Sequence, residues 1–337
     1  MTLNKGYTGS AQIVQPHSVN GSQPDYLFFY HNKQTISQHL PNEQLMEFKN
    51  GIISRNSKIK NYLYYQKSVV PLKNGKVLIT GISKGDNDSD KNIEVNVFDP
   101  IKNKWGNGIT FIEKGYNKYM SCYEQKENEV YCISYDNILV SKLIIKYIKI
   151  NNDGMTFNVT NIDNRQINKN YNSIFNFIKA IPYNENEAIV VFQIGKEINN
   201  QKDENSKKDL YFYHLIVNGH IISVKRYEYL SDQCEERDDQ EDYKIDVAVL
   251  SNKRIYIVCE TGKNTFKGFE IDPDIDKIEN FTFNNFGAEY VKNPVFTKFD
   301  KTLGIFYTHI TSTLNSRVAF HLMNYPDCFD YIDKPNI

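Results

Sequence analysis

The sequence predicts an all-β fold built from repeated antiparallel hairpins. Short apolar strands recur along the chain and are joined in pairs by turns that carry Asn or Asp. Tyr and Phe, which suit half-buried pleated surfaces, are common at 24 and 20 residues. No segment shows sustained helical periodicity with caps, and Asn42–Lys49 is the one place where we expect a short helical turn.

The hairpin pattern is clearest between residues 68 and 105. There an apolar strand meets Asn74 and Gly75, the dipeptide most typical of a tight hairpin, and the returning strand ends at Gly81. A third strand alternates apolar and polar residues and is followed by the only tryptophan, Trp105. This stretch is similar to one kelch repeat, the four-stranded blade of a β-propeller. The resemblance implies structural roles for Asn74, Gly75, Gly81 and Trp105, with Trp105 packed between neighbouring blades.

One propeller blade cannot bury both of its faces, so a single blade predicts several more. Hairpins recur at a spacing of roughly 50 to 65 residues, which suits kelch-like blades with loop insertions. We therefore expect residues 1–337 to form one β-propeller of six blades with four antiparallel strands each, with seven blades as the alternative. The expected blades cover residues 10–60, 61–114, 115–165, 170–230, 240–285 and 288–332.

Two further expectations concern the connections. Residues 196–209 are polar and charged without an apolar pattern, which predicts a mobile loop between two strands of the fourth blade. The segment near Ser10–Gln15 is expected to close the ring by pairing with the C-terminal blade.

The cysteines bear on location. Cys122 and Cys132 flank the third hairpin turn at nearly equal distances, so they should lie opposite each other, either as a disulfide or as two buried thiols. Cys234 and Cys259 are an alternative second pair. This hairpin and four Asn-x-Ser/Thr sequons favour a secreted or cell-surface protein, whereas the missing signal peptide favours the cytoplasm. We lean slightly towards the secreted or cell-surface location.

Charge and hydropathy argue against several partners. The formal net charge is −1, which does not favour binding to nucleic acid or to an anionic membrane surface. No run approaches the roughly 18 apolar residues that a membrane span needs, so we expect no membrane insertion. The acidic stretches at residues 86–90 and 232–242 are interpreted as solvated loops, although carboxylates of this density also suit calcium.

Catalytic motifs are not recognisable. The seven histidines form no metal-type cluster, and there is no Cys-x-x-Cys pair, phosphate-binding glycine loop or nucleophile elbow. We therefore expect no catalytic residue and no cofactor, and favour a non-enzymatic binding or scaffolding module that recognises a protein or a glycan with one propeller face. Tyr62, Tyr64 and Tyr65, at a junction between blades, are candidate contacts.

The alternative is an enzyme. Calcium-dependent hydrolases of the lactonase type use a six-bladed propeller with metal ligands in the central channel. In this chain Glu187, Asp246 and Asn293 are the candidate ligands, because each is expected near an inner strand and carries a hard oxygen donor.

Overall fold

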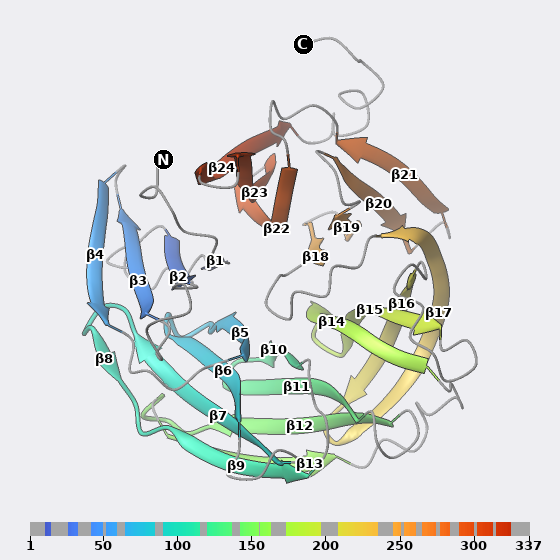
Figure 1. Ribbon diagram of the computed structural model, residues 1–337. Helices are drawn as coiled ribbons and strands as arrows, with labels where there is room; N and C mark the ends of the chain where they lie inside the picture. Colours follow the sequence, from blue (N-terminus) through green and yellow to red (C-terminus); the bar gives the residue numbers. More distant parts are fainter. Residues whose placement is uncertain are drawn as a thin grey trace.

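The computed structural model places its strands in a ring of antiparallel sheets (Figure 1), the arrangement of a β-propeller. The structure describes residues 11–14, 26–32, 42–49, 52–58, 65–84, 90–114, 120–136, 142–154, 156–162, 173–196, 208–234, 245–250, 253–260, 265–273, 277–283, 290–299, 302–312 and 315–324. These residues form six sheets, which we number as blades 1 to 6 in chain order. Every regular element among them is a strand, and the described part of the chain includes no helix that could cross a bilayer.

Six strands line the centre of the ring, one from each blade. They are β1 (Ala11–Val14), β5 (Tyr65–Pro71), β10 (Met120–Lys126), β14 (Ser173–Asn184), β18 (Ile245–Val249) and β22 (Tyr290–Phe299). Successive inner strands contact each other, and β1 contacts both β5 and β22, so the ring closes between the first and last blades.

The other strands follow outwards in chain order. The second strands are β2 (Tyr26–Asn32), β6 (Val77–Lys84), β11 (Glu129–Asp136), β15 (Glu187–Lys196), β19 (Ile255–Glu260) and β23 (Thr302–Ser312). The third strands are β3 (Asn42–Lys49), β7 (Asp90–Asp99), β12 (Lys142–Ile150), β16 (Lys208–Asn218), β20 (Phe266–Asp272) and β24 (Asn315–Asn324). The outer strands are β4 (Ile52–Lys58), β8 (Lys104–Trp105), β9 (Ile109–Lys114), β13 (Phe157–Ile162), β17 (Ile221–Cys234) and β21 (Lys277–Phe283), with β8 and β9 both paired to β7. Blade 2 therefore has five strands where four were expected, and three strands are described in blade 6.

Strand alternation builds the core between the blades. Successive side chains of a strand point to opposite faces, so each blade packs against both of its neighbours. In β11, Cys132 packs towards blade 2 and Ile133 towards blade 4. In β15, Val190 packs towards blade 3 and Val191 towards blade 5. Each such apolar side chain contributes about 1.5–3 kcal/mol by leaving water, which explains why second strands read as nearly continuous apolar runs.

Hydrogen bonds also join the inner strands across the blade boundaries. A side-chain oxygen on one inner strand accepts a bond from a backbone N–H of the next. Three such pairs occur among the described residues, Ser68 with Cys122 N (2.8 Å), Ser121 with Ala180 N (2.9 Å) and Asp246 with Phe296 N (2.7 Å). These bonds satisfy edge groups that would otherwise be unpaired at the inner end of each sheet.

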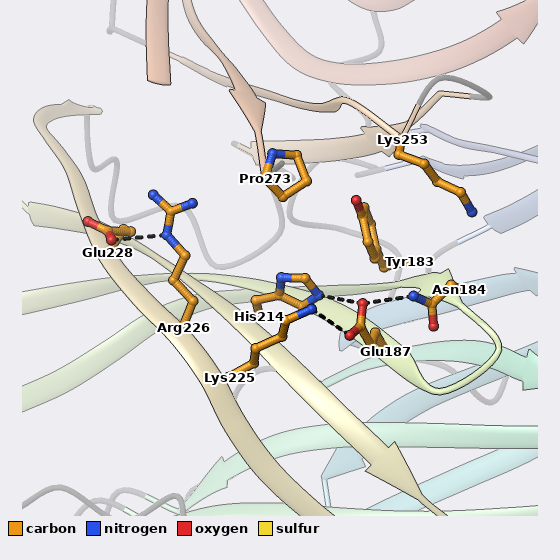
Figure 2. Close-up of a pocket in the computed structure, with 9 residues that line it drawn as sticks. All are labelled: Tyr183, Asn184, Glu187, His214, Lys225, Arg226, Glu228, Lys253 and Pro273. Atoms are coloured by element: carbon orange, nitrogen blue, oxygen red, sulfur yellow. Dashed lines mark hydrogen bonds and ion pairs between the residues drawn. The ribbon is translucent and has the colours of Figure 1, made fainter. Parts of the chain in front are cut away.

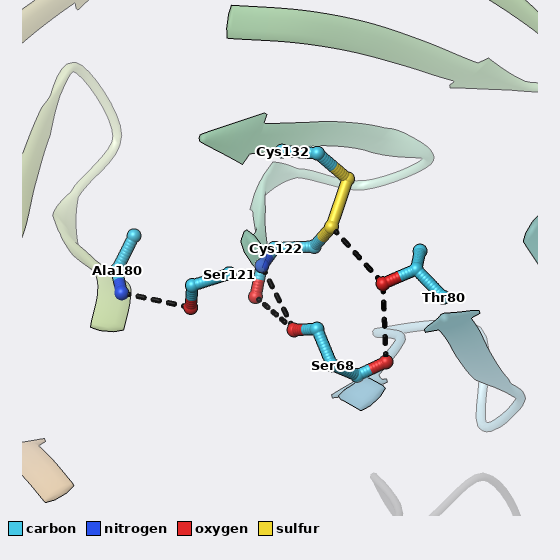
Figure 3. The surroundings of a disulfide bond; sticks show 6 residues. All are labelled: Ser68, Thr80, Ser121, Cys122, Cys132 and Ala180. Atoms are coloured by element: carbon cyan, nitrogen blue, oxygen red, sulfur yellow. Dashed lines mark hydrogen bonds between the residues drawn. A yellow bond between two sulfur atoms is a disulfide. The ribbon is translucent and has the colours of Figure 1, made fainter. Parts of the chain in front are cut away.

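The disulfide expected in blade 3 is present. Cys122 and Cys132 are direct partners in the β10–β11 register, with Cα atoms 4.0 Å apart and the sulfurs bonded. Both are buried, and the hydroxyl of Thr80 in blade 2 lies 3.5 Å from the Cys122 sulfur (Figure 3). The alternative of two free thiols is therefore wrong. Cys259, fully buried in β19, is also disulfide-bonded.

Two sequence-based expectations are wrong. Asn42–Lys49 is the strand β3 and not a helical turn, because it pairs on both sides, with β2 and with β4. The N-terminal strand β1 does not pair with the C-terminal blade. It pairs with β2 of its own blade, with Ala11 opposite Tyr30, and so supplies the inner strand that blade 1 needs. The expected mobile loop falls almost wholly outside the described residues, since β15 ends at Lys196 and β16 begins at Lys208.

Candidate functional site

A cavity of about 550 Å³ lies between blades 4 and 5 (Figure 2), at the end of the ring where the first strand of each blade turns into the second. Blade 4 supplies one wall with side chains from β14 to β17, and blade 5 supplies the other from two of its turns. The lining residues are Tyr183, Asn184, Glu187, His214, Lys225, Arg226, Glu228, Lys253 and Pro273. We call this cavity the blade 4/5 pocket.

Two irregularities in strand pairing shape the blade 4 wall. The β14–β15 register shifts between Pro182 and Asn184, which leaves Tyr183 without an opposite residue. The β16–β17 register shifts in the same way, which leaves Lys225 as the extra residue of a bulge. A bulge breaks the alternation of side chains, so neighbouring residues can face the same side. This explains how Lys225 and Arg226, adjacent in sequence, both line the pocket.

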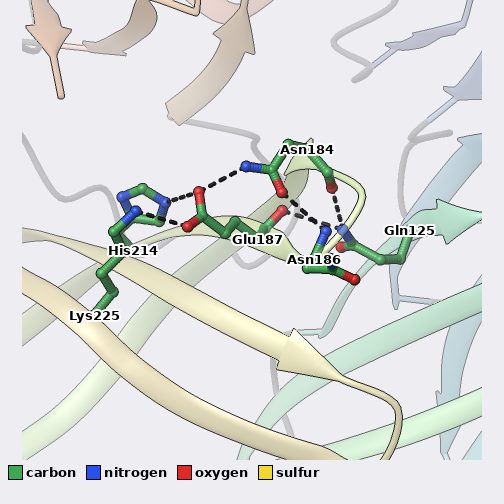
Figure 4. A network of polar contacts seen from close by, with 6 residues as sticks. All are labelled: Gln125, Asn184, Asn186, Glu187, His214 and Lys225. Carbon is green, nitrogen blue, oxygen red and sulfur yellow. Dashed lines mark hydrogen bonds and ion pairs between the residues drawn. The ribbon is translucent and has the colours of Figure 1, made fainter. Parts of the chain in front are cut away.

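Glu187 is the centre of the polar network in the pocket (Figure 4). One of its carboxylate oxygens accepts hydrogen bonds from Asn184 Nδ2 at 2.7 Å and from His214 Nε2 at 3.0 Å. The other accepts a bond from Lys225 Nζ at 2.7 Å. Burial would raise the pKa of Glu187, but the bonds from Lys225 and His214 outweigh it and hold the pKa below its usual value. Glu187 is therefore an ionised acceptor at neutral pH.

His214 is nearly fully buried beneath this carboxylate. Burial lowers its pKa, and the neighbouring Glu187 only partly opposes that effect. The neutral imidazole donates its Nε2 hydrogen to Glu187, since the carboxylate can only accept. The Tyr183 ring and the imidazole pack edge to face with their centroids 4.9 Å apart, so these two rings form the floor of the pocket.

Charged groups complete the rim. Arg226 Nε donates to Glu228 at 3.0 Å. From blade 5, Lys253 Nζ lies over the Tyr183 ring, 5.8 Å from its centroid. Lys253 has a φ of 68°, a left-handed conformation that is uncommon for residues with side chains. The pocket thus combines an ionised acceptor, cations and an aromatic ring, and this chemistry suits a polar ligand with hydroxyl or anionic groups.

The three candidate metal ligands do not form one site in the described structure. Glu187 lies in the blade 4/5 pocket, whereas Asp246 on β18 pairs with Lys179 at 3.1 Å and with a backbone N–H of β22. Asn293 is in β22, but its side chain is outside the described part. No group of three or more His, Cys, Asp or Glu side chains that could hold a metal occurs among the described residues.

The side chains of the three candidate tyrosines lie outside the described part of the chain. Tyr62 and Tyr64 lie outside the described residues, and Tyr65 opens β5 with a side chain that is not described. They remain predictions.

The residues assigned structural roles have clear positions. Asn74 and Gly75 form the turn between β5 and β6, with Gly75 at a φ of 81°. Gly81 pairs with Glu94 inside the blade 2 sheet. The Trp105 ring lies 4.8 Å from the ring of Phe98, its partner in the same blade.

Sequence reasoning did not find most of the pocket. His214, Lys225, Arg226 and Lys253 come from separate strands and turns, and two of them depend on a bulge. The one available signal was the turn Leu250–Arg254, where Lys253 stands in the position that Gly75 holds in the matching turn of blade 2.

Comparisons with known proteins support the β-propeller fold. The sequence matches no protein-family model and no curated protein. Among solved structures it is similar to an α-L-arabinofuranosidase of Fusarium graminearum, with a TM-score of 0.61 and 14% identity over 98% of this chain and 100% of that one. It is also similar to an α-L-arabinanase of Penicillium chrysogenum bound to arabinobiose, with a TM-score of 0.60 and 13% identity over 96% and 98% of the two chains. At this identity the likeness supports the β-propeller fold and does not establish kelch repeats.

The same comparison corrects the functional expectation. The absence of a recognisable catalytic motif led us to favour a non-enzymatic scaffold. The two propellers named above, an arabinofuranosidase and an arabinanase, are glycan-cleaving enzymes, and this finding overturns that expectation. Neither the scaffold nor its lactonase-type alternative is carried further.

Proposed function

We propose that this chain is a carbohydrate-active enzyme that hydrolyses glycosidic bonds. The observation that carries the proposal is the full-length likeness to the arabinofuranosidase, which covers 98% of this chain and all of the other. Since one fold can host many activities, the proposal needs support from the residues of this chain.

The blade 4/5 pocket supplies that support. Its volume of about 550 Å³ falls in the range of small-ligand sites and can hold one or two sugar rings. Glu187 and Asn184 offer acceptors for sugar hydroxyls, and the Tyr183 ring offers a surface for the apolar face of a sugar. Glycoside hydrolysis generally also needs a carboxylic acid that donates a proton. Because Glu187 is held ionised, we assign it to glycan binding and not to proton donation.

The test is direct assay of the purified chain. It would be incubated with arabinan, arabino-oligosaccharides and a panel of chromogenic glycosides, and the products would be separated by chromatography and weighed by mass spectrometry. We expect release of a sugar from at least one substrate, unchanged by a metal chelator, because paired carboxylates alone can cleave glycosides. Complete inactivity across the panel would overturn the proposal.

The remaining expectations join this proposal. We propose one kelch-like propeller domain, a glycan as its partner and an oxidising compartment as its location. The Cys122–Cys132 disulfide supports that location, because structural disulfides persist where thiols are oxidised. Thiol alkylation and peptide mass mapping of the protein from its native source would test it. Alkylation of both cysteines without prior reduction would contradict it.

A further inference from the structure

We propose that the blade 4/5 pocket binds the carboxylate of an acidic sugar, with Lys253 as the group that receives it. The inference rests on the proposed function, because it takes the ligand to be a saccharide, and it narrows that ligand to one bearing a uronate.

The first support is the charge balance of the pocket. Three cationic side chains line it, Lys225, Arg226 and Lys253, against two carboxylates, Glu187 and Glu228. Two of the cations are committed, since Lys225 pairs with Glu187 at 2.7 Å and Arg226 with Glu228 at 3.0 Å. Lys253 is the remaining cation. Among the described residues its side chain contacts the Tyr183 ring and no carboxylate.

The second support is the backbone at Lys253. The turns Leu72–Lys76 in blade 2 and Leu250–Arg254 in blade 5 have the same two backbone hydrogen bonds. The amide of the fourth residue donates to the first carbonyl at 2.9 Å in both, and the first amide donates to the fifth carbonyl at 2.8 and 3.0 Å.

The fourth position is left-handed in each turn, with a φ of 81° at Gly75 and 68° at Lys253. Glycine adopts this conformation without penalty and lysine does not. A strained residue at the mouth of a cavity points to a functional requirement for its side chain. Here the turn places an ammonium group above the aromatic floor of the pocket.

The third support is what surrounds this ammonium group. Glu187 and Asn184 lie across the floor from it and can engage hydroxyls, while Tyr183 can take the face of a sugar ring (Figure 2). A uronate presents these features together: a ring, hydroxyls and one carboxylate. The bulge at Lys225 supplies a second ammonium group that neutralises Glu187, which would otherwise repel an acidic ligand.

The experiment is isothermal titration of the full chain with disaccharides that contain glucuronate or galacturonate, each beside the neutral disaccharide of the same linkage. We expect at least one uronate to bind about ten-fold or more tightly than its neutral counterpart, and the affinity to fall as sodium chloride is raised from low to physiological concentration. Lys253→Gly should weaken uronate binding about ten-fold or more without lowering the melting temperature, since glycine suits the turn.

Lys149→Ala is the matched control. Lys149 pairs with Glu129 in blade 3, so this variant removes one lysine charge away from the pocket and should leave binding unchanged. Equal binding of acidic and neutral sugars, or full affinity in Lys253→Gly, would overturn the inference. Inorganic phosphate binding as tightly as the uronates would also overturn it. The proposed hydrolase activity is judged separately by the product assay, so uronate binding without hydrolysis would reject only the activity.

Discussion

The boundary between blades 2 and 3 is closed by hydrogen bonds, whereas the boundary between blades 4 and 5 holds a cavity. Both features lie at the end of the ring where the first strand of each blade turns into the second. In the first, the blade 2 turn is tied to blade 3, because Lys73 N donates to Glu124 at 2.6 Å and Asn74 Nδ2 donates to Asn128 at 3.0 Å. In the second, the matching turn of blade 5 faces the 550 Å³ pocket, and its described contact with blade 4 there is Lys253 over Tyr183.

The boundary between blades 3 and 4 shows a second contrast with the blade 4/5 boundary, at equivalent positions of the hairpins. The bulges at the ends of β10 and β14 leave Gln125 and Tyr183, respectively, as the unpaired residues. Gln125 crosses from blade 3 to blade 4 and donates to the carbonyl groups of Asn184 and Glu187, which closes the boundary between these two blades (Figure 4). Tyr183 instead packs against His214 of its own blade and lines the floor of the blade 4/5 pocket. One scaffold thus gives a closed or a hollow boundary according to a few polar side chains.

The largest loss of stability is expected from removing the disulfide in blade 3, whose cysteines pack towards blade 2. Replacing Cys122 and Cys132 together by Ala removes a cross-link between residues 10 apart in sequence. The loop-entropy model then gives a loss of about 3 kcal/mol in the free energy of unfolding. Urea denaturation followed by circular dichroism measures it. Because the blade keeps its packing on both faces, the variant should still fold, and a wholly unfolded variant would contradict this view of the bridge as a local staple.

A smaller loss is expected from Glu124→Gln. The Glu124 carboxylate is buried and accepts bonds from two backbone groups, Lys73 N and Asn128 N. Glutamine has one acceptor oxygen, so one of the two N–H groups loses its partner, and the unfolding free energy should fall by about 2 kcal/mol. Glu129→Gln is the control, since its partially exposed pair with Lys149 should be worth less than about 1 kcal/mol. Equal losses would show that the closed boundary does not depend on Glu124.

Exchanging the residues at the left-handed positions of the blade 2 and blade 5 turns should change the stability of the protein in opposite directions. Gly75→Lys places a side chain in the left-handed position and should destabilise the protein by about 1 kcal/mol, whereas Lys253→Gly should stabilise it by a similar amount. Thermal unfolding of both variants measures the shifts. Lys253→Ala separates the causes, because it removes the charge but keeps the strained backbone. If Lys253→Ala stabilised as much as Lys253→Gly, the gain would come from the charge and not from the turn.

Local chemistry explains what could be predicted of the fold. The Asn74-Gly75 turn and the alternating third strand of blade 2 each depend on a few adjacent residues, so the sequence alone identifies this hairpin. Because the hairpin pattern repeats along the chain, the sequence also predicts a ring of blades. The prediction of a helical turn at Asn42–Lys49 is wrong because this segment pairs with β2 and β4, and residue patterns within the segment do not reveal that pairing. Cys122 and Cys132 could be paired because both flank one short turn.

The pocket could not be predicted in the same way. Glu187 and His214 come from the adjacent strands β15 and β16, a bulge in β17 brings Lys225 onto the same face, and Lys253 joins them from the next blade. A bulge shifts the register by one residue, and alternation patterns assume that no such shift occurs. The sequence predicts Glu187 as a metal ligand from its expected place near an inner strand, but its bonding partners are the Lys225 ammonium group, the Asn184 amide and a neutral imidazole.

The smallest effect is a contrast in pH dependence between the two glutamates. Burial raises the pKa of Glu124 despite its backbone hydrogen bonds, whereas the pKa of Glu187 lies below its usual value. A depressed carboxyl pKa stabilises the fold above the unfolded value of about 4.3, and this contribution is lost as the pH falls through the folded value. A raised pKa works in the opposite sense, so its contribution is lost as the pH rises through the folded value.

The deficit of Glu187→Gln relative to the unmodified protein should therefore grow between pH 4 and pH 7, to about 0.5–1 kcal/mol. The deficit of Glu124→Gln should shrink over the same range. Urea denaturation at each pH gives both curves, and Glu129→Gln corrects for general changes in charge. Parallel slopes for Glu124→Gln and Glu187→Gln would mean that the closed and hollow boundaries present the same environment to a carboxylate, and the distinction drawn between them would fail.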